Sequence, residues 1–254
     1  MTKTIGIIPA RYASSRLMGK ALVDIGGKSM IQRVYEQAAL SSALDELWVA
    51  TDDERIALVV AQFGGKVVMT SAAHQSGTDR CAEAVRLCCP DASIVINIQG
   101  DEPFILPEQI DLLANLLQNP TVQIGTLAKA ITTTDELFDS NKPKVVMNKM
   151  GVCLLFSRQA IPFVRQAPAE QWLQHHLYYK HIGMYGYRAA ILQQLTSLPL
   201  SSLEQAESLE QLRWIENGFV IHIAITEHET LSIDTPTDLT MAKKWWAAQQ
   251  KLTK

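Results

Sequence analysis

The stretch IIPARYASSRLMGK, from Ile7 to Lys20, begins as an apolar strand and continues as a basic loop. The loop carries Arg11, Arg16 and Lys20, together with one glycine and no acidic residue. In α/β folds, the loop between the first strand and the next helix is a common place for binding phosphate. The stretch therefore predicts an α/β fold that holds an anion here, although a solvent-exposed basic turn would carry the same charges.

The loop lacks the two glycine-rich fingerprints of nucleotide-binding loops. Neither G-x-G-x-x-G nor G-x-x-x-x-G-K-[ST] is present, and the absence of the first disfavours a nicotinamide-dependent oxidoreductase. The loop supplies cations instead, because arginine can hold two phosphate oxygens at once and lysine acts as a point charge.

The first half of the chain alternates apolar strands with amphipathic helices. Strands of four to six apolar residues between such helices indicate a mostly parallel sheet covered on both faces. In sheets of this kind, ligands bind at the carboxyl ends of the strands near a topological switch point. The expected strands are Thr4–Ile8, Glu46–Thr51, Lys66–Thr70 and Ile94–Ile98.

The pattern changes near residue 120, where the chain becomes richer in strands. The letters NKMG, ending at Gly151, separate two strands and indicate a hairpin. We expect one domain over residues 1–254, with a strand-rich elaboration at about 120–190 that forms a dimer interface. The expected elements are strands at Lys144–Met147, Val152–Phe156, His181–Tyr187 and Val220–Ile225, a helix at Ser201–Trp214 and a last helix from Thr237 whose Trp245 and Trp246 serve packing.

The composition limits the class of protein. A net charge of −3 over 254 residues argues against a general binder of nucleic acid or anionic membranes. No apolar run approaches the roughly 20 residues of a membrane span, and the first residues lack the features of a signal peptide. The four cysteines, Cys81, Cys88, Cys89 and Cys153, form no C-x-x-C pair and are expected as core residues in a reducing cytoplasm.

Acidic residues follow two further strands. VINIQGDEPF places Asp101 at the end of a buried strand, and LSIDTPTDL places Asp234 at the end of another. One or two carboxylates together with substrate phosphates are the usual ligands of Mg²⁺. We therefore predict a divalent metal site at Asp101 and Asp234, although Asp234 could instead cap the following helix. Asp238 fits a first-turn helix acid better than a ligand.

The segment HQSGTDR offers groups for a nucleobase or ribose. Ser76 and Gly77 provide hydroxyl and backbone groups, Arg80 adds a cation, and Asp79 is placed to cap a helix. By itself this segment indicates a nucleotide only weakly.

The motifs taken together resemble one family across nearly the whole chain. IPARYASSRLMGK, ATDDERI, FGGKVVMTSAAHQSGTDR, INIQGDEP, HIGMYGYRA, LEQAESLEQLR and IDTPTDL occur in this order. The sequence resembles the 3-deoxy-manno-octulosonate cytidylyltransferases, also called CMP-Kdo synthetases. The combination of SGTDR, GDEP and SLEQLR is specific to that family.

The resemblance implies a fold, a reaction and partners. The fold would be Rossmann-like, of the nucleotidyltransferase type. The enzyme would take CTP and Kdo with Mg²⁺ and release CMP-Kdo and pyrophosphate for lipopolysaccharide biosynthesis. It would be a cytoplasmic homodimer that binds neither nucleic acid nor membrane.

The resemblance also implies a role for each matching residue. Lys20, Arg16, Asp101 and Asp234 would be catalytic, and Asp101 and Asp234 would hold the metal. The nucleotide would contact Pro9, Ala10, Arg11, Ser14, Arg16, Lys20, Gln75, Ser76, Gly77, Arg80 and Gln99. The sugar would contact Gln99, Arg158, Arg165, His181, Tyr185, Glu210 and Gln211, with Arg158 or Arg165 for its carboxylate.

Some features depart from the family pattern or leave alternatives open. Met18 stands where the family usually has proline, and an acid usually found before Arg165 is missing. The acceptor could be an 8-amino analogue of Kdo or a sialic acid, although GDEP rather than GDQP favours Kdo. A non-catalytic nucleotide-binding protein is a further alternative, against which the joint presence of Lys20, Asp101 and Asp234 argues.

Overall fold

The computed structural model describes residues 2–14, 16–229 and 231–252. The chain divides into two compact units, one of residues 1–114 and 230–254 and one of residues 115–229. In sequence, the second unit is therefore an insertion into the first. The single domain expected over residues 1–254 stays a prediction, and the strand-rich part expected at about 120–190 falls within the second unit.

The first unit is built on four parallel strands. They are β1 (Thr4–Ala10), β4 (Glu46–Thr51), β5 (Val67–Met69) and β6 (Ile94–Asn97), in the order β6-β1-β4-β5. β1 and β6 are buried along almost their whole length, which is why their sequences are continuously apolar. The expected parallel sheet is confirmed, and β5 is shorter than the expected Lys66–Thr70.

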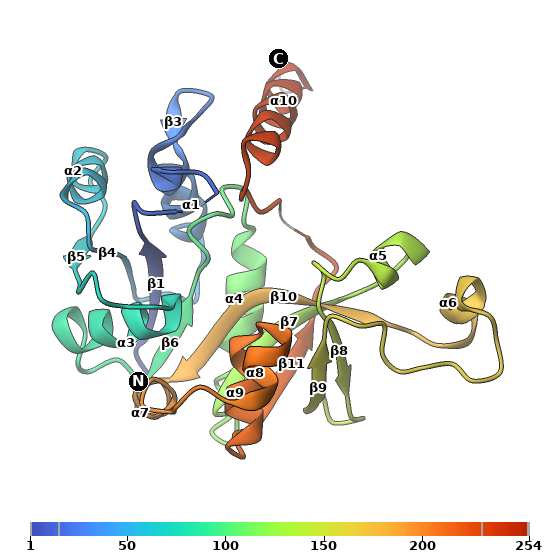
Figure 1. Ribbon diagram of the computed structural model, residues 1–254. Coiled ribbons are helices and arrows are strands. Elements are labelled where there is room, and N and C mark those ends of the chain that lie inside the picture. The colour runs from blue at the N-terminus through green and yellow to red at the C-terminus, as the bar shows by residue number, and fades with distance from the viewer. Residues whose placement is uncertain (1, 15, 230, 253–254) are drawn as a thin grey trace. The chain divides into compact units, whose positions relative to one another are not determined.

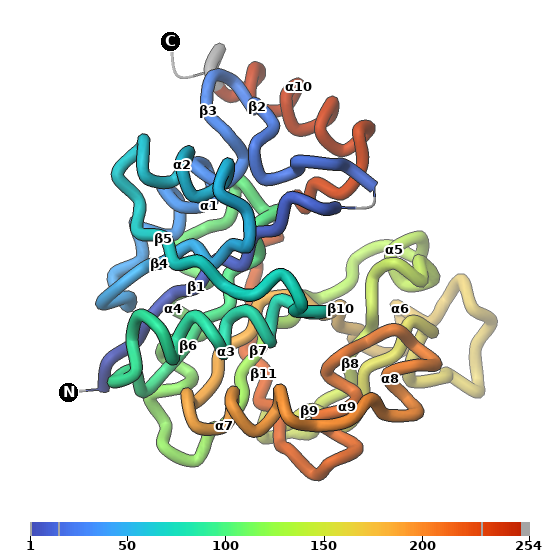
Figure 2. The backbone as a smooth tube through the Cα atoms, turned by 60° about the vertical axis from the view of Figure 1, so that its left-hand side comes forward, coloured from blue at the N-terminus to red at the C-terminus, as the bar shows by residue number. Residues whose placement is uncertain are grey.

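Three helices connect these strands and set the position of the switch point. α1 (Met30–Ala38) and α2 (Glu54–Gln62) carry the chain outward from β1 to β4 and β5. α3 (Gly77–Cys88) carries it back past β4 and β1 to β6 (Figures 1 and 2). Because such crossovers are right-handed, α3 lies on the opposite face of the sheet from α1 and α2. The direction reverses between β1 and β6, so a ligand site is expected at the carboxyl ends of these two strands.

The first unit contains further short elements and two helices. They are the 3₁₀ helix η1 (Lys20–Leu22), the short pair β2 (Asp24–Ile25) and β3 (Lys28–Ser29), and the helices α4 (Pro107–Leu116) and α10 (Pro236–Leu252). Of these, α4 extends to the first residues of the second unit. In α10, Trp246 lies under the Arg33 guanidinium, 3.7 Å from its ring centre, and Trp245 packs on Phe104. The expected packing role of both tryptophans is confirmed.

The second unit contains a mixed sheet. β7 (Ile124–Ala130) pairs parallel with β11 (Ile221–Ile225) and antiparallel with β10 (Tyr179–Arg188). β10 also pairs with β8 (Lys144–Met147), which forms a hairpin with β9 (Cys153–Ser157). Gly151 has a φ of +76° in the hairpin turn, so the turn expected at NKMG is confirmed.

The helices of the second unit are short. They are α5 (Thr134–Phe138), the 3₁₀ helix η2 (Ala169–Gln171), α6 (Trp172–His175), α7 (Ala189–Leu195), α8 (Ser202–Glu207) and α9 (Glu210–Glu216). The prediction of one helix over Ser201–Trp214 is wrong, because Ser208 has a φ of +51° and ends α8 in the left-handed region. The helical pattern of residues continues across this break, so nothing in the sequence indicated that the helix ends at Ser208.

The cysteines behave as core residues. All four are free, and Cys81, Cys89 and Cys153 are buried. Burial raises the pKa of both Cys88 and Cys153 to about 12, so neither thiol is a ready nucleophile.

Across the described parts of the chain, every helix is too short or too polar to serve as a membrane span.

Candidate active site

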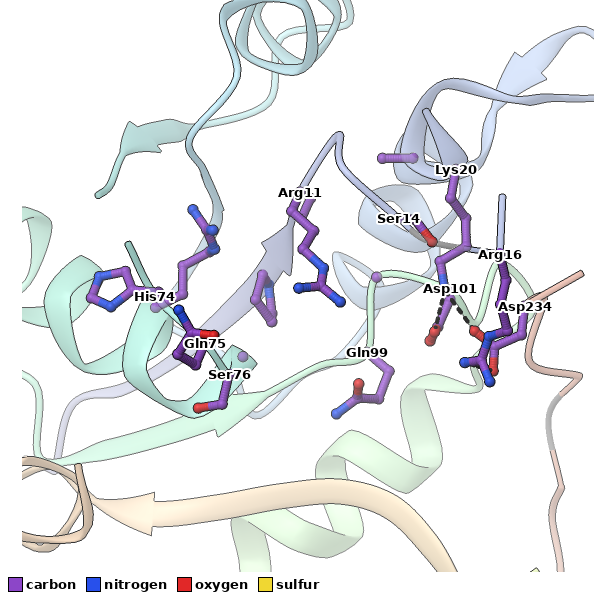
Figure 3. Close-up of a pocket in the computed structure, with 16 residues that line it drawn as sticks. Arg11, Ser14, Arg16, Lys20, His74, Gln75, Ser76, Gln99, Asp101 and Asp234 are labelled. Atoms are coloured by element: carbon purple, nitrogen blue, oxygen red, sulfur yellow. Dashed lines mark hydrogen bonds and ion pairs between the residues drawn. The ribbon is translucent and has the colours of Figure 1, made fainter. Parts of the chain in front are cut away.

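A pocket opens in the first unit where β1 and β6 end (Figure 3). Its lining includes every residue that the sequence analysis assigned to the nucleotide or the metal. The lining residues are Pro9, Ala10, Arg11, Ser14, Arg16, Lys20, Ala21, His74, Gln75, Ser76, Gly77, Arg80, Gln99, Gly100, Asp101 and Asp234. Residues from four separate stretches of the sequence therefore meet at the expected switch point.

The basic loop is folded back by two local hydrogen-bond patterns. The carbonyl of Tyr12 accepts from the amides of both Ser14 and Gly19, at 2.9 and 3.0 Å. The amide of Lys20 donates to the carbonyl of Leu17 at 3.2 Å, and Gly19 between them has φ 67° and ψ 22°. This is the geometry of a type II turn, in which a glycine is favoured at the third position. The turn places Lys20 at the start of η1.

Lys20 lies between two carboxylates. Its Nζ donates to Asp101 Oδ2 at 2.8 Å and to Asp234 Oδ1 at 2.9 Å (dashed in Figure 3). Burial lowers the pKa of Lys20, but the attraction and hydrogen bonds of Asp101 and Asp234 outweigh it, so the pKa is raised. Lys20 is therefore charged over the physiological pH range and is held at the pocket wall.

The loop before α10 brings Asp234 to Asp101. The prediction that Asp234 ends a strand is wrong, because residues 231–234 form an irregular segment before α10. The amide of Ile233 donates to the carbonyl of Asp101 at 2.9 Å, which ties this segment to the loop after β6. Asp238 Oδ2 accepts from the amides of Asp234 and Thr235, while Thr235 Oγ1 accepts from the amide of Asp238. Thr235 and Asp238 thus organise the start of α10, and the expected role of Asp238 is confirmed. The side chain of Asp234 is left to face Lys20 and Arg16, whose Nη2 lies 3.0 Å from Asp234 Oδ2.

The donor set of this cluster fits Mg²⁺. Asp101 and Asp234 offer carboxylate oxygens to the same point, which is taken by the ammonium of Lys20. Within residues 2–14, 16–229 and 231–252, no group of three or more His, Cys, Asp and Glu side chains could hold a metal ion. Two carboxylates without further protein ligands suit a metal that keeps waters and takes substrate phosphates, and do not suit a closed structural site.

The segment Gln99–Gly100 passes close to the end of β1. A Cβ atom on Gly100 would lie 2.8 Å from the carbonyl oxygen of Pro9, so a glycine is needed there. This close approach brings the Gln99 side chain and the Pro9–Ala10 backbone to one wall of the pocket.

The start of α3 forms another part of the lining. Ser76 and Asp79 form a reciprocal capping box, so the expected cap is confirmed. Arg80 is buried, donates to Thr70 Oγ1 at 2.7 Å and lies 3.3 Å from Asp52 Oδ2. The sequence predicted Arg80 as an added cation for the ligand, whereas in the structure its guanidinium is already paired within the protein.

Three residues of the lining were not predicted, namely Ala21, His74 and Gly100. His74 lies within the segment HQSGTDR that the sequence analysis singled out, and its Nε2 lies 2.5 Å from Glu83 Oε2. The position of His74 within that segment was a usable signal. The small Ala21 gave none.

The sugar-side residues lie in the second unit, apart from Gln99. The rings of His181 and Tyr185, both on β10, have centres 5.2 Å apart, and Trp214 of α9 meets Tyr185 edge-on. Gln211 is buried, and its Nε2 has no hydrogen-bond partner within the described residues. Such a buried amide group is placed to receive a ligand oxygen.

The two arginines proposed for the sugar carboxylate differ in their surroundings. The guanidinium of Arg158 donates to the carbonyls of Glu207, Ser140 and Ser208, at 2.6, 2.9 and 3.3 Å. Glu207 in turn accepts from Ser157 Oγ and from the amide of Arg158. Arg158 is thus used to hold the left-handed break between α8 and α9. Arg165 is exposed, which leaves it the better placed of the two for an anion.

A pocket with Arg11, Arg16 and Lys20 beside a carboxylate pair, at the switch point of a parallel sheet, defines an enzyme that handles nucleotide phosphates. The chain belongs to the cytidylyltransferase family, whose sequence model matches residues 5–239.

Relatives and a solved structure narrow this class. A protein of Bacteroides thetaiotaomicron named 3-deoxy-manno-octulosonate cytidylyltransferase is 56% identical over 247 residues, which cover 96% of this chain and 98% of the relative. A protein of the same name from Thermodesulfovibrio yellowstonii is 50% identical over 95% of this chain and 97% of its own. A CMP:2-keto-3-deoxy-manno-octonic acid synthetase, solved in complex with CTP, superposes with a TM-score of 0.90 at 42% identity and covers 98% of this chain and 100% of its own.

Proposed function

We propose that this protein transfers CMP from CTP to the anomeric hydroxyl of 3-deoxy-manno-octulosonate, giving CMP-Kdo and pyrophosphate. The sugar oxygen attacks the α-phosphorus, and the bond from that phosphorus to the bridging oxygen of the β-phosphate breaks. The hydroxyl proton is lost and pyrophosphate leaves. The names of the relatives and the CTP complex of the similar structure support both substrates.

The observation that carries the proposal is the position of Lys20 between Asp101 and Asp234. Among the described residues, the ammonium of Lys20 donates to these two carboxylates and to no backbone carbonyl. The ammonium can exchange a carboxylate for a phosphate oxygen when a nucleotide enters. Lys20 is therefore suited to stabilise the charge that develops on the α-phosphate.

Arg11 and Arg16 position the triphosphate. Both line the pocket from the same loop as Lys20, and arginine can bind two oxygens of a phosphate at once. Phosphoryl transfer depends chiefly on in-line placement and charge neutralisation. The loop thus supplies placement through its arginines and charge stabilisation through Lys20, while the Pro9–Ala10 backbone and Ser76 border the base and ribose.

Mg²⁺ held by Asp101 and Asp234 would neutralise the phosphates and lower the pKa of the attacking hydroxyl. Lys20 and Arg16 lie against these carboxylates in the structure, so a metal ion would exchange with their cationic groups.

On the acceptor side, we assign the hydroxyls of the sugar to His181, Tyr185, Glu210 and Gln211, and its carboxylate to Arg165. The buried, unpartnered Gln211 amide and the exposed Arg165 support this assignment. Gln99 at the pocket wall would contact both substrates.

The protein would act as a cytoplasmic homodimer whose product serves lipopolysaccharide biosynthesis. Exposed apolar side chains in the strand-rich unit, among them Leu154, Leu155 and Leu177, support a self-association surface there. Light scattering coupled to gel filtration tests this, and a monomer at micromolar concentration would contradict it.

Release of pyrophosphate tests the function. We expect turnover with CTP plus Kdo and Mg²⁺, and none when UTP or NAD replaces CTP. Parallel assays with 8-amino-Kdo and a sialic acid identify the acceptor. Turnover confined to one of these would correct the acceptor, and no turnover with any of them would favour a non-catalytic nucleotide-binding protein.

The metal assignment is tested by Asp101→Ala and Asp234→Ala. Each should raise the Mg²⁺ concentration needed for half-maximal rate, because one carboxylate ligand is lost. If either variant keeps a near-native kcat at limiting Mg²⁺, the metal assignment is wrong.

A further inference from the structure

The antiparallel pairing of β7 with β10 is interrupted by a bulge (Figure 2 shows both strands). Ile182 pairs with Leu127, but the next pair along is Tyr185 with Thr126, so Gly183 and Met184 are extra residues on β10. A bulge disturbs the ladder of hydrogen bonds and leaves backbone groups to be satisfied by other means. Bulges also re-aim neighbouring side chains, and His181 lies just before this one.

Thr126 compensates the bulge with its side chain. It is fully buried in the central strand β7, and its Oγ1 lies 2.8 Å from the carbonyl oxygen of Met184 and 3.3 Å from that of Ile182. The same oxygen lies 3.0 Å from Nε2 of His181. One hydroxyl group thus meets two carbonyls and one imidazole nitrogen.

The number of protons available to this hydroxyl group determines which ring nitrogen of His181 is protonated. A threonine hydroxyl has one proton to donate, and a carbonyl can only accept. The proton therefore goes to a carbonyl, with Met184 the nearer, and the lone pairs of Oγ1 are left for His181. It follows that Nε2 of His181 carries the hydrogen and that Nδ1 is an acceptor.

The surroundings keep the imidazole neutral. The rings of Phe156 and Tyr185 pack on it, with ring centres 5.1 and 5.2 Å away. Burial lowers the pKa of His181 to about 3.

We propose that Thr126 is a positioning residue that holds His181 as the neutral tautomer protonated on Nε2, so that Nδ1 accepts a hydrogen bond from a hydroxyl of the acceptor sugar. The role of His181 toward the sugar rests on the proposed function. The assignment of its tautomer does not, because it follows from contacts within the protein. Thr126 acts on the acceptor substrate only through His181 and has no part in binding the nucleotide.

The tautomer is measured by NMR of the enzyme labelled with ¹⁵N-histidine, in the absence of substrates. Couplings from the ring protons distinguish a protonated nitrogen from a bare one. We expect a bare Nδ1 and a protonated Nε2 for His181, assigned by comparison with His181→Gln. A hydrogen on Nδ1, or on both nitrogens at neutral pH, overturns the proposal whatever the enzyme's substrate is.

Steady-state kinetics of Thr126→Val and Thr126→Ser test whether Thr126 affects binding of the sugar. Valine keeps the shape of threonine and removes the hydroxyl, and serine keeps the hydroxyl. We expect Thr126→Val to raise the KM for the sugar about three- to tenfold, as loss of one well-placed hydrogen bond does. The KM for CTP should stay unchanged, and Thr126→Ser should restore the native values. An unchanged sugar KM in Thr126→Val, or equal rises in both KM values, overturns the proposal.

Two further outcomes are distinguishable. If Thr126→Val fails to fold, the tautomer of the wild type and the kinetics of Thr126→Ser still test the proposal. A Thr126→Ser variant that has the other tautomer of His181 and a native KM for the sugar contradicts it. If the wild type shows the expected tautomer but no turnover with CTP and any acidic sugar, the proposed function fails, and with it the role for the sugar.

Discussion

Lys20 in the first unit and Lys180 in the second each donate to two carboxylates, but their surroundings differ. Lys20 contacts Asp101 and Asp234 at the wall of a pocket that also holds Arg11 and Arg16. Lys180 is buried on β10, contacts Glu136 and Glu229, and shares Glu136 with Lys142. A lysine between two acids is thus compatible with either catalysis or structure.

The location of each lysine–carboxylate cluster indicates whether it serves catalysis or stabilises the fold. The carboxylates of the first cluster lie at the switch point, where α/β sheets bind ligands: Asp101 follows β6, and Asp234 lies in the segment before α10. Those of the second come from the start of α5 and from the segment after β11, and Lys180 is 2% exposed. We therefore interpret the Lys180 cluster as a support of the second unit. Four predictions test this contrast, in order of decreasing expected effect.

Lys20→Met should lower kcat by about 10²–10³-fold, the loss typical of a removed transition-state donor. Stability should change by less than about 1 kcal/mol, because Asp234 is partly open to solvent and can rehydrate. Steady-state kinetics and urea unfolding of the same preparation measure both quantities. A kcat within about threefold of the wild type would refute the catalytic role of Lys20.

Lys180→Met should show the reverse pattern. The side chain of Lys180 is almost fully buried, and its removal takes one cationic partner from each of Glu136 and Glu229, so the free energy of unfolding should fall by about 1–3 kcal/mol. The KM for CTP of the folded protein should match that of the wild type. A stable variant with impaired CTP binding would contradict the structural interpretation of this cluster.

The dependence of stability on acidic pH tests the structural role of the Lys180 cluster. Burial by itself raises the pKa of Glu136, but the hydrogen bonds from Lys142 and Lys180 lower it from 4.5 to about 2. Because the folded-state pKa lies below the ordinary value, the ionised carboxylate stabilises the fold above about pH 4.5, and this contribution is lost as the pH falls toward 2.

The matched control is Glu136→Gln, which cannot ionise. The difference in unfolding free energy between wild type and this variant should be largest at neutral pH and should shrink below pH 4.5. A difference that is constant down to pH 3 would show that Glu136 is not stabilised in its charged form.

The smallest effect is expected at Met18, the residue that departs from the family pattern. It occupies the second position of the type II turn from Leu17 to Lys20, where proline is favoured, and its side chain is 74% exposed. Met18→Pro should stabilise the protein by about 0.4–1 kcal/mol and lower the KM for CTP, because Lys20 is better preorganised. Met18→Ala is the control, and an unchanged or higher KM in Met18→Pro would exclude this explanation.

The sequence predicted most of the first unit and its pocket because their signals are local. The apolar strands, the basic loop, Asp101 after its strand and the Ser76–Asp79 cap each lie within a few consecutive residues, whereas the described residues just before Asp234 do not form the predicted strand. The second unit was harder to predict from the sequence, because its sheet contains both parallel and antiparallel strands. The roles of its sugar-side residues were implied by the family resemblance alone. The break at Ser208 and the use of Arg158 to hold it were not predicted, because neither changes the hydrophobic period.

By itself, the sequence determined the α/β class, the cation-bearing loop and the acids available to a metal, because residue types and spacing encode strands, turns and ligand chemistry. Only the tertiary structure decided which of these residues meet. Lys20 contacts partners 81 and 214 residues away, and Thr126 reaches His181 across 55 residues. Such contacts depend on strand order and on a register shift between β7 and β10, and these are properties of the packed sheet that no local pattern records.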